Sequence, residues 1–352
     1  MNRAFVLLRT SRPRRERIKT MSRQNRTRTV ATLLIVFLLG FSHVAVGVQD
    51  KSKNQKAAAD GVPVLWHDPG DVSTRDLFLG PGGEEMKPDL TSVTFIREET
   101  DGYSVKYRVR DGAGKTWVAK LGKEAQSETA ATRLLWAIGY VTEVNYLAPC
   151  VQIKGAPRPR KDVGRCEGQG FSNVRFEARP EDTERLDNWS WKQNPFTGTK
   201  ELQGLIVLMA MLNNWDIKDT NNRVLFVAGS PGELRYVISD LGATFGKTGN
   251  AITHNRNEPE TFVKTKFIKG VAGGRVEFAY GGKNTGLFKD VTIEQARWLG
   301  DLLARLSDEQ LGNAFRAANY SAEEIQLLAE AVRARINELV NLPGQSDAIR
   351  TN

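Results

Sequence analysis

Residues 205–222 read Leu-Ile-Val-Leu-Met-Ala-Met-Leu-Asn-Asn-Trp-Asp-Ile-Lys-Asp-Thr-Asn-Asn, and this stretch decides how the rest of the chain is interpreted. An apolar run with helical character ends in a polar loop that contains Asp216, Lys218 and Asn221. In phosphoryl transfer, a carboxylate can orient the attacking hydroxyl, a cation can neutralise charge on the moving phosphoryl group, and an amide oxygen can help to hold Mg²⁺. The order of residues in the loop therefore suits phosphoryl transfer.

A second carboxylate follows nineteen residues after Asn221, in the sequence Tyr-Val-Ile-Ser-Asp-Leu-Gly at residues 236–242. Asp240 closes an apolar strand there, and Gly242 permits a sharp turn. Residues 223–227 and 234–239 predict a hairpin that would deliver Asp240 beside the preceding loop. Because proteins usually hold Mg²⁺ with one or two carboxylates plus phosphate oxygens, Asp240 is a natural second metal ligand.

The net charge of the chain is concentrated at its N-terminus. The 352 residues carry a formal charge of +9, and residues 1–29 alone contain ten Lys or Arg and one acid, Glu16. The rest of the chain is therefore about neutral. This argues against a nucleic-acid-binding protein, since a binding domain would keep a basic patch in its folded part. A chain of this length can bury a large core, as two domains or one bilobal domain.

The basic N-terminus is followed by an apolar stretch, Val30–Phe41, and by small residues that end at Gly47. This order matches a secretory signal, with Met21 as an alternative start. Because about 20 apolar residues are needed to span a bilayer, we expect a cleaved signal within residues 1–49. An anchor formed by residues 30–47 and a buried helix are the alternatives. The protein is then expected in the periplasm, the cell envelope or outside the cell, touching a membrane only through this segment.

Only two cysteines are present, Cys150 and Cys166. In an oxidising compartment they could form a disulfide that closes a short loop, and two unpaired buried thiols are the equal alternative. Neither arrangement supplies the four or so ligands that zinc requires, since the chain after the leader has only His67 and His254.

The middle of the chain predicts a small antiparallel sheet. Its loop Lys154–Gly170 is basic and rich in Pro and Gly, and is either a solvated insertion or a recognition patch. Residues 61–90, before the sheet, are expected to form an irregular lead-in over the surface. Alternating apolar residues separated by turns indicate five strands, at residues 93–98, 103–110, 116–121, 142–153 and 173–178.

Lys120 ends the third of these strands, and the helix that follows contains a candidate partner for it. Residues 127–140 have helical spacing, with Ser127 as the expected N-cap and Glu128 in the first turn. Alone, Lys120 is typical of an edge strand, and Glu128 is a favourable charge near the positive end of a helix. As a pair they would position the lysine on phosphates, with Glu124 as the alternative partner.

After Asp240 the sequence pattern first loses its periodicity and then becomes helical. Residues 244–286 are rich in Gly, Lys and Asn with little periodicity, so we expect a mobile segment next to the site. Helical patterns resume at residues 292–306 and 321–339, the second opening with a capping box at Ser321. The sequence thus predicts an α+β chain with four parts after the leader: a linker and lead-in over residues 50–90, a sheet lobe over 91–180, a mainly helical lobe over 181–342 and a tail over 343–352.

The order of these elements along the chain resembles that of the bilobal protein-kinase-like superfamily over roughly residues 92–340. The order is Lys120 on a strand, Glu128 on the next helix, the loop of Asp216 to Asn221, and Asp240-Leu-Gly242 after a hairpin. The spacing of Asp216, Lys218 and Asn221 is similar to that of the protein-kinase catalytic loop. Asn214-Trp-Asp216 with Asn221 is also similar to the loop of HipA-type kinases, and the phosphoinositide kinases use a similar spacing. The resemblance implies that Asp216 and Lys218 are catalytic, with Asp216 orienting an acceptor hydroxyl, and that Asn221 and Asp240 hold the metal.

The same resemblance implies a nucleotide site. ATP would be the cofactor, with Mg²⁺ or Mn²⁺ as the metal, and the phosphoryl acceptor would be an unknown hydroxyl. Lys120 would contact the nucleotide phosphates, Glu128 would pair with Lys120, and Gly102 in the first hairpin would lie over the phosphates. The implied fold is an N-terminal antiparallel sheet lobe with one helix, joined to a mainly helical C-terminal lobe.

The chain also departs from the ordinary protein-kinase pattern. It has no Gly-x-Gly-x-x-Gly loop, Asn214-Trp215 replaces the His-Arg that precedes the catalytic aspartate, and Asp240-Leu-Gly replaces Asp-Phe-Gly. No Ala-Pro-Glu follows, so a protein-kinase substrate platform is not supported. These departures indicate an atypical member and leave the acceptor and the oligomeric state open.

Two functions of different classes follow. The first is an exported atypical kinase that transfers the γ-phosphoryl of ATP to a hydroxyl of a protein or a small molecule. The second is a catalytically inactive pseudokinase that serves as a binding or scaffold module in the envelope. The plain structural alternative is that Asp216 and Asn221 cap a helix and a turn, and that Asp240 ends a strand. A hydrolase lacks support, since no Gly-x-Ser-x-Gly elbow occurs.

Overall fold

A computed structural model describes residues 60–250 and 252–343 of the chain. These residues belong to one compact unit, Lys56–Asn352. The leader predicted over residues 1–49 lies outside the described residues, as do residues 50–59 of the linker and residues 344–352 of the tail. Within the described part, no helix has both the length and the apolar composition required to cross a bilayer.

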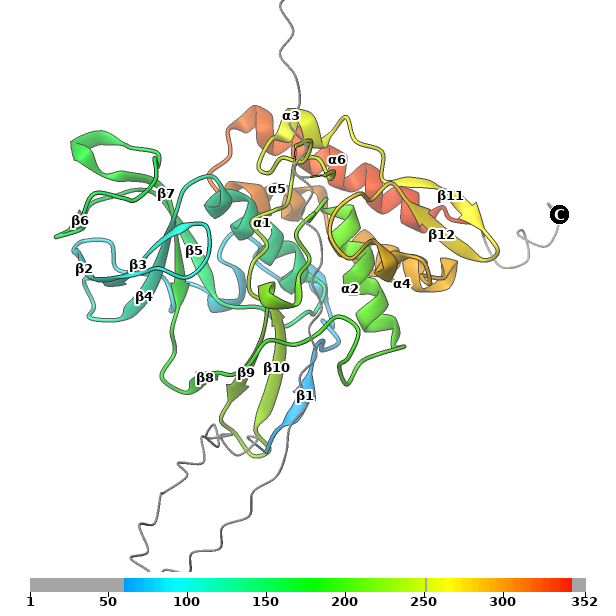
Figure 1. The fold of residues 1–352 in the computed structure, drawn as a ribbon, viewed down its shortest axis with the longest axis horizontal. Helices are drawn as coiled ribbons and strands as arrows, with labels where there is room; N and C mark the ends of the chain where they lie inside the picture. Colours follow the sequence, from blue (N-terminus) through cyan, green and yellow to red (C-terminus); the bar gives the residue numbers. More distant parts are fainter. Residues whose placement is uncertain (1–59, 251, 344–352) are drawn as a thin grey trace, which may run out of the picture. The chain divides into compact units, whose positions relative to one another are not determined.

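The N-terminal half is organised around one six-stranded sheet with the strand order β5-β7-β4-β3-β2-β6 (Figure 1). Neighbouring strands are antiparallel, except for β2 and β6. The predicted sheet is therefore confirmed, with a short extra strand at its edge. Its strands are β2 (Val93–Glu99), β3 (Val105–Arg110), β4 (Thr116–Leu121), β5 (Asn145–Val151), β6 (Ile153–Lys154) and β7 (Phe171–Ala178).

The two faces of this sheet differ in chemistry because side chains alternate along each strand. One face is apolar and forms its own core, in which Tyr107, Trp117 and Phe176 are buried. The register sets Lys120 opposite both Lys106 and Arg175, so these three side chains share the other face. That face is charged, and Glu128 contacts both Lys120 and Arg175 on it.

Helix α1 (Glu124–Ala137) follows β4 and is buried along most of its length. It begins one turn earlier than expected, because Gly122 adopts a φ of +100° and its carbonyl accepts the Ala125 N–H at 3.1 Å. Ser127 is therefore not the N-cap, as the sequence predicted. Its hydroxyl lies within the helix and donates instead to the Gly242 carbonyl at 3.0 Å, while the Thr244 hydroxyl donates to the Ser127 carbonyl at 3.3 Å.

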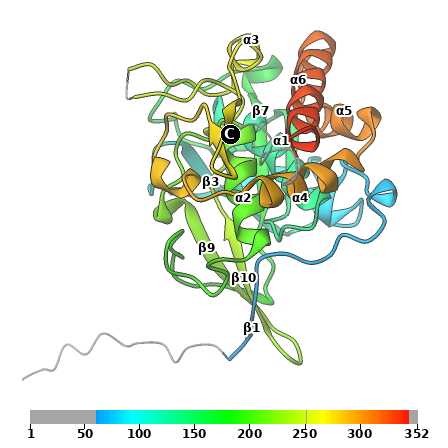
Figure 2. The ribbon, with the colours of Figure 1, turned by 90° about the vertical axis from the view of Figure 1, so that its right-hand side faces the viewer.

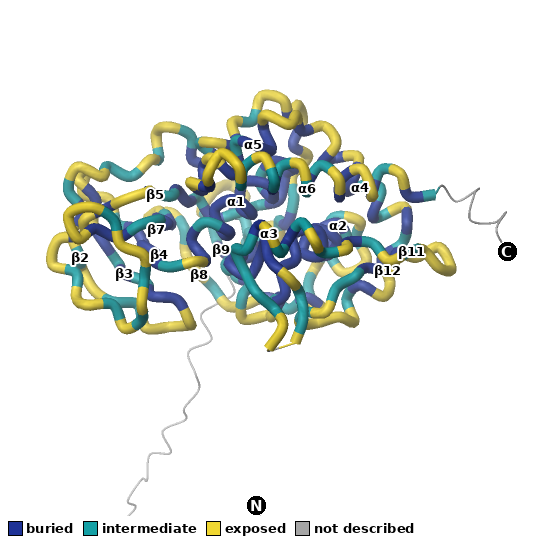
Figure 3. The backbone as a smooth tube through the Cα atoms, turned by 90° about the horizontal axis from the view of Figure 1, so that it is seen from above, coloured by how far each residue is buried: buried dark blue, intermediate teal, exposed yellow. Residues whose placement is uncertain are grey.

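The C-terminal half is mainly helical. Helices α4, α5 and α6 each begin with a capping box, which confirms the one predicted at Ser321. Figure 3 shows buried backbone along α1 and α2, where the larger apolar core lies. Helix α4 packs against α2 and α6, and α5 packs against α1 and α6. The longer helices are α2 (Lys200–Met211), α4 (Ile293–Ala304), α5 (Asp308–Arg316) and α6 (Ala322–Val340).

The described residues of the segment 244–286, which was expected to be mobile, are packed against this core. They include helix α3 (Pro259–Phe262) and a hairpin of β11 (Ile268–Ala272) and β12 (Arg275–Phe278). Phe245, Phe262 and Phe267 are buried in the larger core. The segment shows little periodicity in sequence because its burial rests on isolated aromatic residues.

A second sheet has the order β1-β10-β9-β8 and lies beside the helices (Figure 1 and Figure 2). It contains the predicted hairpin, β9 (Asn222–Val227) and β10 (Glu233–Ile238), with β8 (Thr183–Arg185) on one side. On the other side β1 (Val62–Val64) pairs in parallel with β10. Residues 61–90 are therefore more than a surface lead-in, since they also bury Leu65, Val72 and Leu77 in the larger core.

The chain therefore has the α+β architecture that the sequence predicted. A β-sheet with one helix is followed by a helical region that carries the Asp216 loop and the hairpin before Asp240. Short 3₁₀ segments complete the connections: Val72–Thr74, Gly80–Gly82, Glu167–Gln169, Asp219–Asn221 and Thr285–Phe288.

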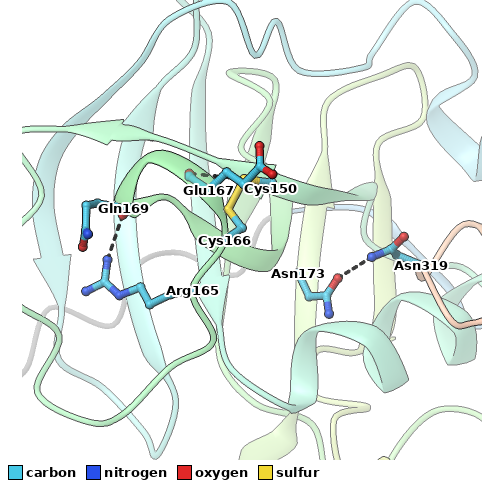
Figure 4. Close-up of a disulfide and its surroundings, with 7 residues drawn as sticks. All are labelled: Cys150, Arg165, Cys166, Glu167, Gln169, Asn173 and Asn319. Atoms are coloured by element: carbon cyan, nitrogen blue, oxygen red, sulfur yellow. Dashed lines mark hydrogen bonds between the residues drawn. A yellow bond between two sulfur atoms is a disulfide. The ribbon is translucent and has the colours of Figure 1, made fainter.

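Cys150 and Cys166 form a disulfide, with an S–S distance of 1.99 Å and a Cα–Cα distance of 5.8 Å (Figure 4). Cys150 is exposed and Cys166 is half-buried, so the alternative of two buried thiols is wrong. The bridge closes the base of the basic loop. The tip of that loop is tied to the β2–β3 hairpin, because Arg160 and Lys161 donate to the carbonyls of Ser104 and Tyr103, both at 2.7 Å.

Replacing Cys150 and Cys166 with serine should lower the free energy of unfolding by about 3 kcal/mol, because the bridge restricts the unfolded chain over a short loop. Urea unfolding of the oxidised protein and of the double variant measures the difference. Reduction of the native protein should give the same loss. Equal midpoints for all three samples would show that the bridge adds nothing to stability.

Candidate active site

The Asp216 loop begins where α2 ends. Asn213 takes a φ of +54°, which asparagine tolerates at a helix terminus, and the Asn214 N–H bonds back to the Met209 carbonyl at 2.9 Å. The chain then turns through the 3₁₀ segment Asp219–Asn221. The amide of Asn221 donates to the Asp216 carbonyl at 2.6 Å and lies 3.3 Å from Asp216 Oδ2, so the two predicted residues are in contact.

Lys218 lies on the same loop as a cation paired with Asp216. Its Nζ is 2.9 Å from Asp216 Oδ2, and the side chain is 46% exposed while that of Asp216 is 19% exposed. The ammonium group of Lys218 therefore lies on the solvent side of the Asp216 carboxylate. In this position Lys218 could meet a group that approaches Asp216 from outside.

Asp240 is held next to Asn221 by the backbone. The N–H groups of Ser239 and Asp240 both donate to the Asn221 carbonyl, at 2.8 and 3.2 Å. The Asp240 carboxylate is fixed through Oδ1, which accepts the Gly242 N–H at 3.1 Å. The hairpin thus delivers Asp240 to the Asp216 loop, as the sequence analysis expected.

Lys120 is the centre of the site, and three carboxylates surround its ammonium group. Its Nζ lies 2.7 Å from Glu128, 3.0 Å from Glu124 and 3.4 Å from Asp240. Both candidate partners from the sequence therefore contact the lysine, and the Asp240 contact joins the sheet to the C-terminal half. Glu124 also accepts a hydrogen bond from the Ser104 hydroxyl and forms an ion pair with Arg256.

Burial and charge act against each other on these groups. Burial alone would lower the pKa of Lys120, but Asp240 and Glu128 outweigh it and raise that pKa. Burial raises the pKa of Glu128, against the opposing effect of Arg175 and Lys120. Burial also disfavours the charged form of Asp240, yet Lys120, the Gly242 N–H and Lys106 hold the pKa of that carboxyl below its usual value. Lys120 and Asp240 are therefore both charged at neutral pH.

A buried ionic network extends the site along β7, and the sequence analysis did not identify it. Arg175 lies 3.2 Å from Glu128 and 2.5 Å from Glu177. Glu177 also accepts a hydrogen bond from Arg179 and lies 3.6 Å from Arg185. Burial opposes the charge on Glu177, but Arg179, Arg175 and Arg185 hold its pKa far below the ordinary value. The alternation of polar residues in β7 was the one available signal.

Gly102 lies in the turn between β2 and β3, with a φ of +81° that favours glycine. Its carbonyl accepts a hydrogen bond from Arg160 at 3.3 Å. A Cβ at this position would lie 3.6 Å from the Nζ of Lys106, so the hairpin tip lies beside the charged face of the sheet.

Two oxygen atoms of this site are of the kind that divalent metals bind. In the described part of the chain, Asp240 Oδ2 and Asn221 Oδ1 accept no hydrogen bond and lie on residues joined through their backbones. No group of three His, Cys, Asp or Glu side chains among the described residues is arranged to bind a metal. A metal would therefore use one carboxylate, one amide and phosphate oxygens, as Mg²⁺ often does.

A cavity of about 820 Å³ adjoins this cluster. Its walls come from the β2–β3 turn, the start of α1, the basic loop and the segment around Arg256, and they include Glu124 but not Lys120, Asp216 or Asp240. The cavity therefore opens beside the ion pair of Glu124 and Arg256.

The comparisons with known proteins are limited to overall architecture. No protein-family model matches the chain, and no curated protein matches it significantly. The structure is similar to that of the Helicobacter pylori proinflammatory kinase CtkA, at 12% identity and a TM-score of 0.44, over 76% of this chain and 99% of that chain.

It is also similar to the Golgi casein kinase, at 9% identity and a TM-score of 0.38, over 75% of this chain and 74% of that chain. A structure of that kinase with Mn and ADP bound gives 10% identity and a TM-score of 0.31, over 75% of each chain. Because these TM-scores lie below 0.5, the similarity does not assign a role to any residue of this chain.

Proposed function

We propose that the protein is an exported atypical kinase that transfers the γ-phosphoryl of ATP to a hydroxyl of a protein or a small molecule. One observation carries the proposal. The ammonium group of Lys120 contacts both Glu128 of α1 and Asp240 after β10, at 2.7 and 3.4 Å. This arrangement joins a phosphate-binding cation to a metal-binding carboxylate across the two halves of the chain.

Each residue then has a task in the transfer. Glu128 holds Lys120 in place, and Lys120 neutralises charge on the nucleotide phosphates. A bound Mg²⁺ or Mn²⁺ would supply further charge neutralisation, with Asp240 and Asn221 as its protein ligands. Asp216 orients the acceptor hydroxyl and accepts its proton, while Lys218 stabilises the charge that develops nearby.

The proposal includes the arrangement of the chain. Residues 91–180 would form the N-lobe and residues 181–342 the C-lobe, with the nucleotide between them. Among kinase-like proteins, Asn214-Trp-Asp216 with Asn221 supports a likeness to the HipA-type kinases, and the spacing from Asp216 to Asn221 supports one to the phosphoinositide kinases. The disulfide between Cys150 and Cys166 supports export, since such bonds persist in oxidising compartments.

Calorimetric titration with ATP and Mg²⁺ tests this proposal. Wild-type protein should bind the nucleotide, and Asp240→Ala should bind it much more weakly, because the variant loses the metal-binding carboxylate and a partner of Lys120. Bound nucleotide at a hundredfold its Kd should raise the free energy of unfolding by about 2.7 kcal/mol. No binding by wild type, or equal binding by both proteins, would reject the kinase.

A second candidate, an inactive pseudokinase that serves as a binding module, is favoured by the contact between Glu124 and Lys120. The carboxylate lies 3.0 Å from Nζ, where it competes with phosphate for the same cation. The chain also lacks a glycine-rich loop. This candidate predicts that neither nucleotide nor Mg²⁺ changes the thermal midpoint, so a clear shift in wild-type protein would argue against it.

A further inference from the structure

Lys106 stands apart from the other cations on the charged face of the sheet. It lies on β3 directly opposite Lys120, and its side chain is half-buried. Among residues 60–250 and 252–343 its ammonium group forms neither a hydrogen bond nor an ion pair, whereas that of Lys120 contacts three carboxylates. In the described part of the chain, Lys106 is therefore a partly buried ammonium group without an ion-pair partner.

The nearest carboxylate on the neighbouring strand is already occupied. Glu99 of β2 lies opposite Lys106 in the register. Its carboxylate instead accepts hydrogen bonds from Arg108 at 2.7 Å and from Arg97 at 3.2 Å. Lys106 is thus left without an ion-pair partner, although the carboxylate of Glu99 stands opposite it in the sheet.

This arrangement costs stability. Like charges directly opposite each other in a sheet are destabilising, and burial penalises an unpaired charge. Both effects are present here, because burial and then Lys120 lower the pKa of Lys106. Destabilising charges of this kind are often found where they serve binding or catalysis.

The position of Lys106 is suited to binding nucleotide phosphates, a task for which the sequence has no glycine-rich loop. In kinases with a glycine-rich loop, backbone around the hairpin covers the nucleotide phosphates. Here the turn has a single glycine, Gly102, and the ammonium group of Lys106 lies under that turn. The negative charge of Asp240 acts in the opposite direction to burial and favours the charged form of Lys106.

We propose that Lys106 and Lys120 form a paired polyphosphate-binding site, in which Lys106 holds the β- and γ-phosphates of a nucleoside triphosphate. The inference rests on the proposed kinase function and names the residue that replaces the glycine-rich loop. A polyphosphate would supply the counter-charge that Lys106 lacks and would relieve its repulsion with Lys120. Charge-assisted hydrogen bonds of this kind are about twice as strong as neutral ones.

The test compares wild-type protein with Lys106→Met and Lys106→Gln. Both variants should bind ATP with Mg²⁺ about tenfold to a hundredfold more weakly, as expected for the loss of a hydrogen bond to a charged group. The loss should be smaller for ADP and smallest for AMP, which lacks both outer phosphates. Thermal midpoints should stay the same or rise, because the repulsion with Lys120 is gone. A merely structural lysine would give a lower midpoint and equal losses for all three nucleotides.

Lys115→Met is the matched control, since it removes the same charge from the exposed turn at the far end of β4. Its affinity for ATP should equal that of wild type. Inorganic tripolyphosphate is titrated as a second probe, because it tests the paired lysines without a nucleoside.

The outcomes separate the two proposals. If wild type binds ATP and the Lys106 variants bind it equally well, the inference is overturned and the kinase stands. If wild type binds only tripolyphosphate, and does so through Lys106, the anion site stands and the ATP-dependent kinase fails. If wild type binds neither probe, both proposals are overturned.

Discussion

Asp216→Asn should lower the rate of phosphoryl transfer by about 10²–10⁴-fold while the affinity for ATP and Mg²⁺ changes little. A positioned general base contributes an acceleration of about this size. Asparagine keeps the shape of the side chain, and the bond from Asn221 to the carbonyl of residue 216 at 2.6 Å does not depend on the carboxylate. The variant therefore removes the proton acceptor and the ion pair with Lys218, while the bond from Asn221 that shapes the loop is kept.

The rate is measured as release of ADP, with water or the protein itself as the acceptor, and affinity is measured by calorimetry. Asp301→Asn is the control, since it makes the same chemical change on the exposed face of α4. Its rate should equal that of wild type. A wild-type rate in Asp216→Asn would remove Asp216 from the mechanism, and a matching loss of affinity would make it a binding residue.

Arg175→Met should lower the free energy of unfolding by about 3–5 kcal/mol, the range for removing one partner from a buried ion pair. Arg175, Glu128 and Glu177 have side chains that are 4%, 2% and 5% exposed. Without the arginine, both glutamates lose a buried counter-charge. Equilibrium unfolding in urea measures the difference from wild type.

Arg97→Met provides the comparison for this stability effect. Arg97 forms an ion pair with Glu99, but its side chain is 61% exposed. Surface pairs contribute about 0–1 kcal/mol, so this variant should stay close to wild type. If Arg175→Met is as mild as Arg97→Met, the network along β7 does not stabilise the fold.

The sequence predicted much of the candidate site because each residue stands at a recognisable break in a pattern. Lys120 ends a strand, Asp216 and Asn221 follow an apolar helix, and Asp240 precedes a glycine. The structure brings Lys120 to Asp240 and Asn221 to Asp216, as these patterns implied.

Lys106, Arg175 and Glu177 were missed for a physical reason. Each alternates with apolar residues along a strand, and such polar positions usually face solvent. Here this face is covered, because Glu128 of α1 contacts Lys120 and Arg175 on it, and Asp240 contacts Lys120. A strand pattern distinguishes two faces but does not tell which element will cover the polar one.

The remaining errors have a similar origin. The parallel pairing of β1 with β10 joins residues far apart in the chain, which no local pattern reveals. The start of α1 was misplaced because a serine that serves a tertiary contact is indistinguishable in sequence from an N-cap. Ser127 reaches the Gly242 carbonyl, and that contact depends on the folded chain.

The joint between α1 and Gly242 limits how an effector could regulate this protein. A Cβ at Gly242 would lie 2.7 Å from Cβ of Glu124, so the two segments touch without a side chain between them. Two hydrogen bonds of Ser127, one donated to Gly242 and one accepted from Thr244, fasten the same joint. An outward movement of α1 would therefore either displace Asp240 with the helix or break these contacts. Separating the sheet half of the chain from the helical half would break the same two hydrogen bonds, so a movement that keeps them must carry α1 and Asp240 together.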